Sequence, residues 1–200
     1  MTAEEFKELL LQKTVQEIVS DYITIDDPGP FVSQDAIDYV VQQARLRFQI
    51  GADQPITPIV VGSAKLGFSI VEKLKPDYKP RYRLYREGVS DIDLALVSPS
   101  LYGKVWSDIA LYGANRDRFP WRSGDLADYM LHGWIRPDKL PKPATSRCQD
   151  FFDLVTTLNG STFFRFKKLR CALYHSRYFL NLYQQRSVNS AKLAAQMDEL

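Results

Sequence analysis

The chain has few of the residues that build metal clusters or disulfide frameworks. Its 200 residues include only two cysteines, Cys148 and Cys171, and two histidines. Neither cysteine belongs to a Cys-x-x-Cys pair, which argues against the common structural zinc sites. The first residues, MTAEEFK, lack the apolar segment of a signal peptide. We therefore expect a cytoplasmic location, where both thiols stay reduced and free.

Long apolar runs and a strong excess of charge are also missing. No run approaches the roughly 18 apolar residues of a membrane-spanning helix, so no membrane partner is expected. The formal net charge is +2, which is too small to indicate a nucleic-acid-binding protein by itself. Between Arg165 and Arg186, however, acidic residues are absent and six Lys and Arg accumulate. That stretch is either a phosphate-binding face or a solvated helix face.

The remaining composition, 45% hydrophobic and 25% charged, is typical of a folded globular protein. Side-chain periodicity predicts strands at 58–61, 91–97 and 164–174. It predicts helices at 3–20, 33–48, 65–74, 100–112, 126–131, 148–158 and 177–197. Residues 75–89 are typical of an exposed loop or irregular hairpin, and most of 113–147 of a loop. We expect an α/β (α+β) fold with a small mixed sheet flanked by helices. A single domain would span 1–200, with N-terminal helices over about 1–50 and a basic strand and helix over about 164–198.

Two aspartates open the second predicted strand. Side chains alternate along a strand, so Asp91 and Asp93 point to one side, about 7 Å apart, while Ile92 and Leu94 point into the core. Two carboxylates on one face repel each other unless a cation lies between them. Mg²⁺ suits this position because it prefers oxygen ligands and accepts substrate phosphates as further ligands. We predict that Asp91 and Asp93 bind Mg²⁺ or Mn²⁺.

A glycine and a serine follow the first predicted strand. Gly62 would let the backbone approach a phosphate, and the Ser63 hydroxyl with the next free N–H groups would hold it. Lys65 and Ser69 are further candidates for contacting the nucleotide. Gly-Ser alone is a turn, and Asp-x-Asp alone is often a strand end. Their order along the chain indicates a phosphoryl-transfer site for a nucleoside triphosphate (NTP), with in-line attack on the α-phosphate.

The pattern VVGSAKLGFS followed by SDIDLALVS resembles the signature of the nucleotidyltransferase superfamily, the proteins with a DNA polymerase β-like fold. The resemblance covers roughly residues 58–98, with a looser match over 164–197. It implies the nucleotidyltransferase fold, with Gly62 and Ser63 at the triphosphate. It also implies that Asp91 and Asp93 are the catalytic metal ligands.

The chain departs from that pattern in two places. The spacer between Ser63 and Asp91 has 27 residues, which is long. Its extra part, around Lys75–Val89, is either decoration or a substrate-contacting loop that carries four basic residues. They are Lys79, Arg81, Arg83 and Arg86. Active members also place a third acid on a later strand, whereas 164–174 contains none. The acids nearest in sequence are Asp125, Asp128, Asp150 and Asp153, and nothing in the sequence selects one of them.

These departures leave several functions open. The first is an active enzyme that moves a nucleoside monophosphate from an NTP to a hydroxyl of RNA, a protein or another nucleotide. Resemblance to stand-alone proteins of this kind implies a role in bacterial antiphage defence or a toxin–antitoxin system. The alternative is a catalytically impaired module that binds nucleotide or a partner protein as a regulator. The missing third acid favours the alternative, and the intact acid pair opposes it. A third hypothesis is a subunit that docks a partner through the helix at 177–197.

Overall fold

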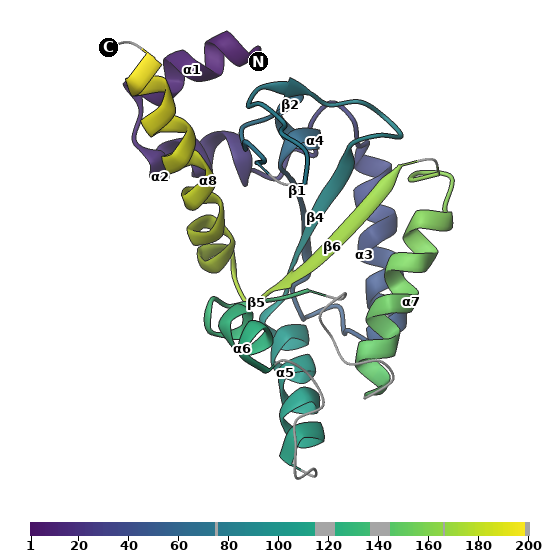
Figure 1. Cartoon of the computed structure of the whole chain (residues 1–200). Coiled ribbons are helices and arrows are strands. Elements are labelled where there is room, and N and C mark those ends of the chain that lie inside the picture. Colours follow the sequence, from purple (N-terminus) through teal and green to yellow (C-terminus); the bar gives the residue numbers. More distant parts are fainter. Residues whose placement is uncertain (75, 115–122, 137–144, 166, 199–200) are drawn as a thin grey trace.

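The computed structural model describes residues 1–74, 76–114, 123–136, 145–165 and 167–198. Its centre is a mixed sheet with the strand order β1-β4-β6-β5 (Figure 1). The strands are β1 (Thr57–Val61), β4 (Asp91–Val97), β6 (Lys168–Tyr174) and β5 (Trp134–Ile135). Strand β4 runs antiparallel to β1 and parallel to β6, and β5 runs antiparallel to β6. The expected small mixed sheet in an α/β chain is confirmed.

Helices cover both faces of the sheet because its strands present apolar side chains on both sides. On one face, Val60 and Leu94 belong to a core shared with three helices. These are α3 (Gln34–Phe48), α5 (Pro99–Ala114) and α7 (Ser146–Gly160). On the other face, Ile59 and Ala95 belong to a second core. The helices of that core are α1 (Ala3–Gln12), α2 (Val15–Ile18) and α8 (Arg177–Asp198). Figure 1 shows α3 and α7 on the opposite side of the sheet from α8.

The prediction of a single helix over 3–20 is wrong, because the helix is interrupted in the middle of that range. Thr2 caps α1 together with Glu5, and Thr14 caps α2 together with Glu17, each in a capping box. A capping box satisfies two backbone N–H groups at a helix start, so the second box begins a new helix instead of continuing the first. A π-helical turn, η1 (Val19–Ile23), then follows directly.

The helix expected over 65–74 is also wrong. Only one turn forms, α4 (Ser63–Leu66), and Gly67 ends it with a φ of 89°. This left-handed conformation favours glycine and turns the chain into β2 (Phe68–Ser69). Strand β2 pairs with β3 (Arg83–Leu84), which makes the segment between them a hairpin with a further bridge between Lys73 and Lys79. One of the two predicted forms of residues 75–89, the irregular hairpin, is therefore present.

Most other expected elements form with shifted ends. The Ser33 hydroxyl caps α3 as predicted, accepting a hydrogen bond from Ala36 N at 3.2 Å. The helix expected at 126–131 is α6 (Ser123–Leu131), which packs beside β5. The strand expected to begin at Phe164 begins at Lys168 instead, because residues 161–165 form a bend and turn. Much of the loop expected over 113–147 lies outside the described residues.

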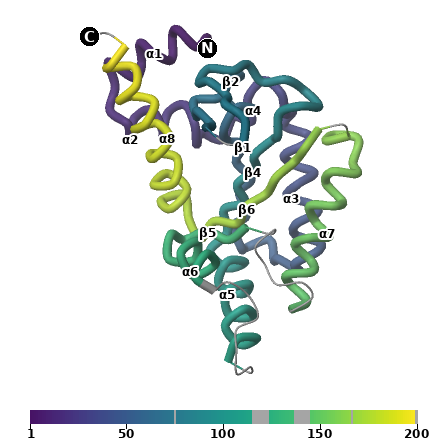
Figure 2. The backbone as a smooth tube through the Cα atoms, viewed as in Figure 1, coloured from purple at the N-terminus to yellow at the C-terminus, as the bar shows by residue number. Residues whose placement is uncertain are grey.

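The two ends of the chain lie side by side (Figure 2). The Lys192 ammonium on α8 donates to Leu10 O at 2.6 Å and to Lys13 O at 2.7 Å, which satisfies carbonyls at the end of α1. Both cysteines are free, as expected, and both are buried. Within the described residues, no helix combines the length and the apolar character needed to cross a membrane.

Candidate functional site

The two aspartates of β4 lie on one face of the sheet, as the strand alternation predicts. Ile92 and Leu94 are buried on the other face, with 0% and 2% of their surfaces exposed. Asp91 keeps 24% of its side chain exposed, and Asp93 is partly buried. The sheet therefore holds both carboxylates rigidly at the end of β4 where the strand begins.

The electrostatics of the pair favour a bound cation. Burial raises the pKa of Asp93, and the neighbouring charge of Asp91 raises it further. Arg170, Lys73 and Arg136 act in the opposite direction but do not reverse the shift. A carboxylate that is costly to ionise in the free protein gains stability when a cation approaches it.

Gly62 is required at its position for two separate reasons. Its φ of 69° and ψ of −147° lie in a region that is almost restricted to glycine. A Cβ atom there would also lie 3.1 Å from Asp93 Oδ2. Because Val61 pairs with Asp93 across the sheet, the turn after β1 passes directly over the acid. Gly62 thus lies against Asp93, although α4 is a single turn. The contact of Gly62 and Ser63 with a triphosphate stays a prediction.

An arginine lies beside the acids on the neighbouring strand. In the parallel register of β4 and β6, Arg170 is the partner of Asp93, and its Nη2 lies 2.9 Å from Asp91 Oδ2. The sequence analysis noted that this strand lacks an acid and that it belongs to the basic stretch between Arg165 and Arg186. In the described part of the chain, no group of three or more His, Cys, Asp or Glu could hold a metal ion. The four candidate third acids also lie outside the lining of the cleft at this site.

That cleft has a volume of about 830 Å³ and lies between the sheet, α4, the β2–β3 hairpin, α7 and α8. Its described lining includes both aspartates, Gly62, Ser63 and Ser69. Five cationic side chains also line it: Lys73, Lys79, Arg83, Arg136 and Arg170. Five cations against two carboxylates make the cleft basic, and Lys73 lies directly opposite Lys79 in the hairpin. Like charges in opposed positions destabilise a hairpin, so this pair is better accommodated when an anion is bound.

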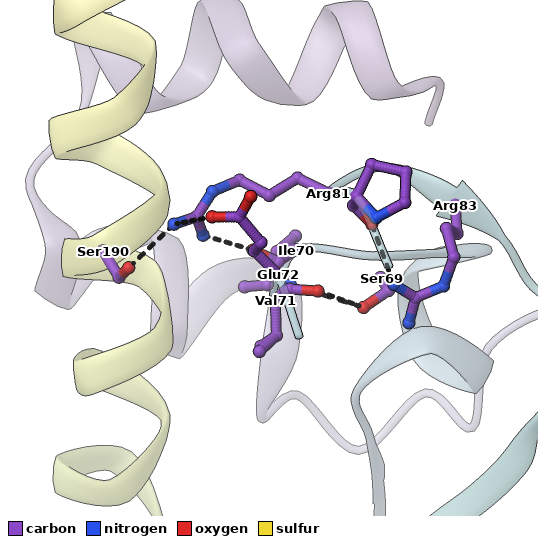
Figure 3. Close-up of polar contacts among 8 residues, drawn as sticks. Ser69, Ile70, Val71, Glu72, Arg81, Arg83 and Ser190 are labelled. Atoms are coloured by element: carbon purple, nitrogen blue, oxygen red, sulfur yellow. Dashed lines mark hydrogen bonds and ion pairs between the residues drawn. The ribbon is translucent and has the colours of Figure 1, made fainter. Parts of the chain in front are cut away.

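Two of the four spacer cations named from the sequence, Lys79 and Arg83, line the cleft. Arg81 instead ties the hairpin to α8 (Figure 3). Its Nη1 donates to Ile70 O and its Nη2 to Ser190 Oγ, both at 3.0 Å, with Glu72 beside the guanidinium at 3.9 Å. Lys73 and Arg136 were missed. Arg170 belongs to the basic stretch that the sequence offered as a phosphate-binding face, but its place beside the aspartates was not predicted.

Ser69 and Lys65, both predicted to contact nucleotide, have other contacts in this structure. The Ser69 hydroxyl donates to Val71 O at 3.1 Å and accepts from Val71 N at 3.3 Å, which closes a local turn (Figure 3). Only 3% of the Lys65 side chain is exposed, and its Nζ donates to Asp27 O and lies 3.7 Å from Asp27 Oδ2. Burial lowers the pKa of Lys65, and Asp27 partly offsets this. Lys65 therefore supports the loop before α3, and we leave it out of the candidate phosphate site.

The site thus combines a carboxylate pair, a glycine turn passing over it and a basic cleft. This arrangement can bind an anion that carries several charges together with a divalent cation. No protein-family model matches the chain, and neither a curated protein nor a solved structure matches it.

Proposed function

We propose that the chain binds a nucleoside triphosphate with Mg²⁺ or Mn²⁺ in the basic cleft and transfers the nucleoside monophosphate to a hydroxyl acceptor. The observation that carries the proposal is that Asp91 and Asp93 line that cleft together, with Gly62 lying against Asp93. The order β1, Gly62-Ser63, α4, β4 also supports a nucleotidyltransferase fold, which is part of the same proposal. The acceptor would be a hydroxyl of RNA, a protein or another nucleotide.

The residues fit a divalent cation that arrives with its substrate. Mg²⁺ commonly uses one or two protein carboxylates, with phosphates and water completing six oxygen ligands. Asp91 and Asp93 supply the two carboxylates, and the raised pKa of Asp93 marks a position where positive charge is favoured. When bound, the cation would neutralise charge on the phosphates during transfer.

The residues around the acids have separate tasks in this proposal. Lys73, Lys79 and Arg83 on the hairpin would hold the β- and γ-phosphates, and Ser63 would contact them from the turn. The acceptor oxygen would attack the α-phosphorus while the bond to the bridging oxygen breaks and diphosphate leaves. The proton of the acceptor hydroxyl passes to water or to a base on the acceptor, since no acid of β6 faces the acceptor position among the described residues.

The test is transfer of label from each α-³²P NTP, with Mg²⁺ or Mn²⁺, into total RNA, protein or small nucleotides. We expect label in one of these classes with the wild type, and a loss of at least about 100-fold in Asp91→Ala and Asp93→Ala. Asp53→Ala is a matched control because Asp53 is an exposed acid outside the cleft. Equal transfer by the wild type and both site variants would contradict the proposal.

A second candidate function has its own observation. Arg170 occupies the β6 position beside Asp93, and its ion pair with Asp91 neutralises part of the charge that a metal would need. This favours a catalytically impaired module that binds nucleotide, or a partner protein, as a regulator. Calorimetry separates the two functions: NTP binding without transfer of label to any acceptor would support the regulatory module.

A further inference from the structure

The wall that α8 contributes to the cleft differs from the basic hairpin on the other side. Tyr183, Gln184 and Ser187 line the cleft from this helix. Their spacing of i, i+1 and i+4 places them on one helical face. None of the three carries a charge, so this wall is suited to a neutral polar group and not to a phosphate.

Gln184 is a mostly buried polar residue whose side chain lines the cleft. Only 7% of it is exposed. Its amide atoms are not among the fully enclosed, unpaired side-chain atoms of the described residues, so an amide atom without a protein partner is open to solvent. An amide that is open to a cleft can bond water in the free protein and exchange that water for a polar group of a ligand. Since Gln184 faces the cleft, its amide offers one acceptor oxygen and two N–H donors to a ligand.

An aromatic ring lies next to this amide. Tyr183 is 38% exposed, and its ring makes edge contacts with Trp134 at 5.0 Å and Tyr174 at 6.2 Å between centroids. Trp134 and Tyr174 are almost fully buried and stack on each other at 6.1 Å. The two buried rings fix the orientation of Tyr183, while part of its surface stays open to the cleft.

This wall is close enough to the carboxylates to act on the same ligand. Tyr183 and Gln184 line the same cleft as Asp91 and Asp93. Burial raises the pKa of Tyr183, and the charge of Asp93 raises it further, which agrees with this placement. Arg136 acts on both groups in the opposite direction. A ligand whose phosphates lie at Asp93 and the hairpin would therefore extend its other end toward α8.

We propose that Tyr183 and Gln184 form the nucleobase subsite of the cleft, with the base stacked on the Tyr183 ring and its edge bonded to the Gln184 amide. The inference rests on the proposed function, because it requires that the phosphates of the same nucleotide lie at the basic hairpin side of the cleft. A base is the part of a nucleotide that needs both an aromatic surface and a mixed donor and acceptor group. A phosphate needs neither, and an apolar ligand would leave the amide unpaired.

The experiment compares the four NTPs with inorganic tripolyphosphate, which has the phosphates and lacks the base. Isothermal titration calorimetry with Mg²⁺ would measure the dissociation constant of each ligand for the wild type, Tyr183→Leu and Gln184→Leu. We expect the wild type to bind at least one NTP about 10-fold more tightly than tripolyphosphate. Each substitution should remove most of that advantage and leave tripolyphosphate affinity within about twofold.

The controls are the same substitutions at exposed positions of the same helix. Tyr178→Leu and Gln196→Leu lie outside the cleft lining and should bind every ligand as the wild type does. Gln184→Glu keeps the shape of the side chain and removes its donors, so the order of preference among the four bases should change. This variant gives a second readout if Gln184→Leu fails to fold, which circular dichroism would reveal.

The possible failures are distinguishable. If the wild type binds neither NTP nor tripolyphosphate, the proposed function fails and the subsite fails with it. If the wild type binds tripolyphosphate as tightly as every NTP, the phosphate site stands and the base subsite alone is overturned. The subsite is also overturned if both α8 variants keep the full preference for an NTP.

Discussion

The guanidinium of Arg170 lies 2.9 Å from Asp91 Oδ2 across two parallel strands. The arginine side chain is 63% exposed, so water screens this ion pair and its net contribution to stability is at most about 1 kcal/mol. The pair nevertheless places a fixed positive charge where a divalent cation would bind. Arg170 therefore competes with metal for Asp91, and a substitution can measure that competition.

Replacing Arg170 should increase metal affinity. In Arg170→Gln the competing charge is gone, and we expect Mn²⁺ to bind about three- to fivefold more tightly, which corresponds to the energy of a screened ion pair. Electron paramagnetic resonance of free Mn²⁺ would measure the affinity. Arg47→Gln is the matched control because it removes a similar arginine–aspartate pair, with Asp153 at 3.2 Å, on a different face of the sheet. Weaker metal binding in Arg170→Gln would show that the arginine supports the site instead of competing for it.

The raised pKa of Asp93 predicts a pH-dependent stability. The folded protein holds the Asp93 proton more tightly than the unfolded chain, so this group favours folding at low pH. That contribution is fully present below the unfolded pKa and is lost as pH rises through the higher folded pKa. The variant Asp93→Asn has no carboxyl group to ionise at this position, so it does not lose this stability as pH rises. We therefore expect the variant to melt above the wild type at pH 7 without metal, with a difference that shrinks toward pH 4.

Differential scanning fluorimetry across this pH range would measure the effect, with Asp53→Asn as the exposed-acid control. Adding Mg²⁺ and NTP should reverse the order at pH 7, because only the wild type keeps both carboxylates for the cation. A melting temperature of Asp93→Asn below that of the wild type at every pH without metal would contradict the assigned cause.

Glycine at position 62 should be much harder to replace than glycine at position 67. Both have positive φ, but Gly67 has nothing within 4 Å of an added Cβ, while Gly62 has Asp93 Oδ2 at 3.1 Å. We expect Gly67→Ala to cost about 1 kcal/mol of unfolding free energy and Gly62→Ala about 2–3 kcal/mol. Gly62→Ala should also weaken Mn²⁺ binding, because the methyl group displaces the acid.

Urea unfolding and Mn²⁺ titration would measure these two effects. Gly103→Ala supplies a third reference, since Gly103 lies within α5 and a Cβ there meets nothing within 4 Å. Alanine at that helical position should stabilise the protein by about 0.5–1 kcal/mol. Equal costs for the substitutions at 62 and 67, or an unchanged Mn²⁺ affinity in Gly62→Ala, would contradict a role for the contact between Gly62 and Asp93.

Two lysines close together in the sequence should differ in their effect on nucleotide binding. Lys73 lines the cleft, whereas the Lys65 ammonium bonds to Asp27. We expect Lys73→Met to weaken NTP binding about fivefold through the loss of one charge-assisted contact. Lys65→Met should leave NTP affinity within about twofold and lower the melting temperature through the loss of its contact with Asp27. Calorimetry of both variants would measure this, and a larger loss of affinity in Lys65→Met would restore Lys65 to the phosphate site.

Local patterns determined the elements that have strong local signals. The alternation around Asp91 and Asp93 set both acids on one face because a strand has a period of two residues. The Ser33 cap set the start of α3 for a similarly local reason, namely a hydroxyl bonded within one turn. The same kind of signal was overlooked at Thr14, where Thr and Glu three residues apart end one helix and begin another.

Tertiary structure decided what surrounds the acids. The register of β6 against β4 brings Arg170 beside Asp93 although 76 residues separate them, and no local propensity encodes that pairing. The orientation of the Lys65 side chain depends on Asp27, and Asp27 lies beside it only because the loop before α3 packs against α4. The basic cleft likewise exists only once the hairpin, β5, β6 and α8 meet. Sequence by itself thus determined the carboxylate pair and the glycine turn, because both arise within a few residues. Only the packed fold decided which charges face the two carboxylates, because charges from distant segments meet only after the sheet and its helices have packed together.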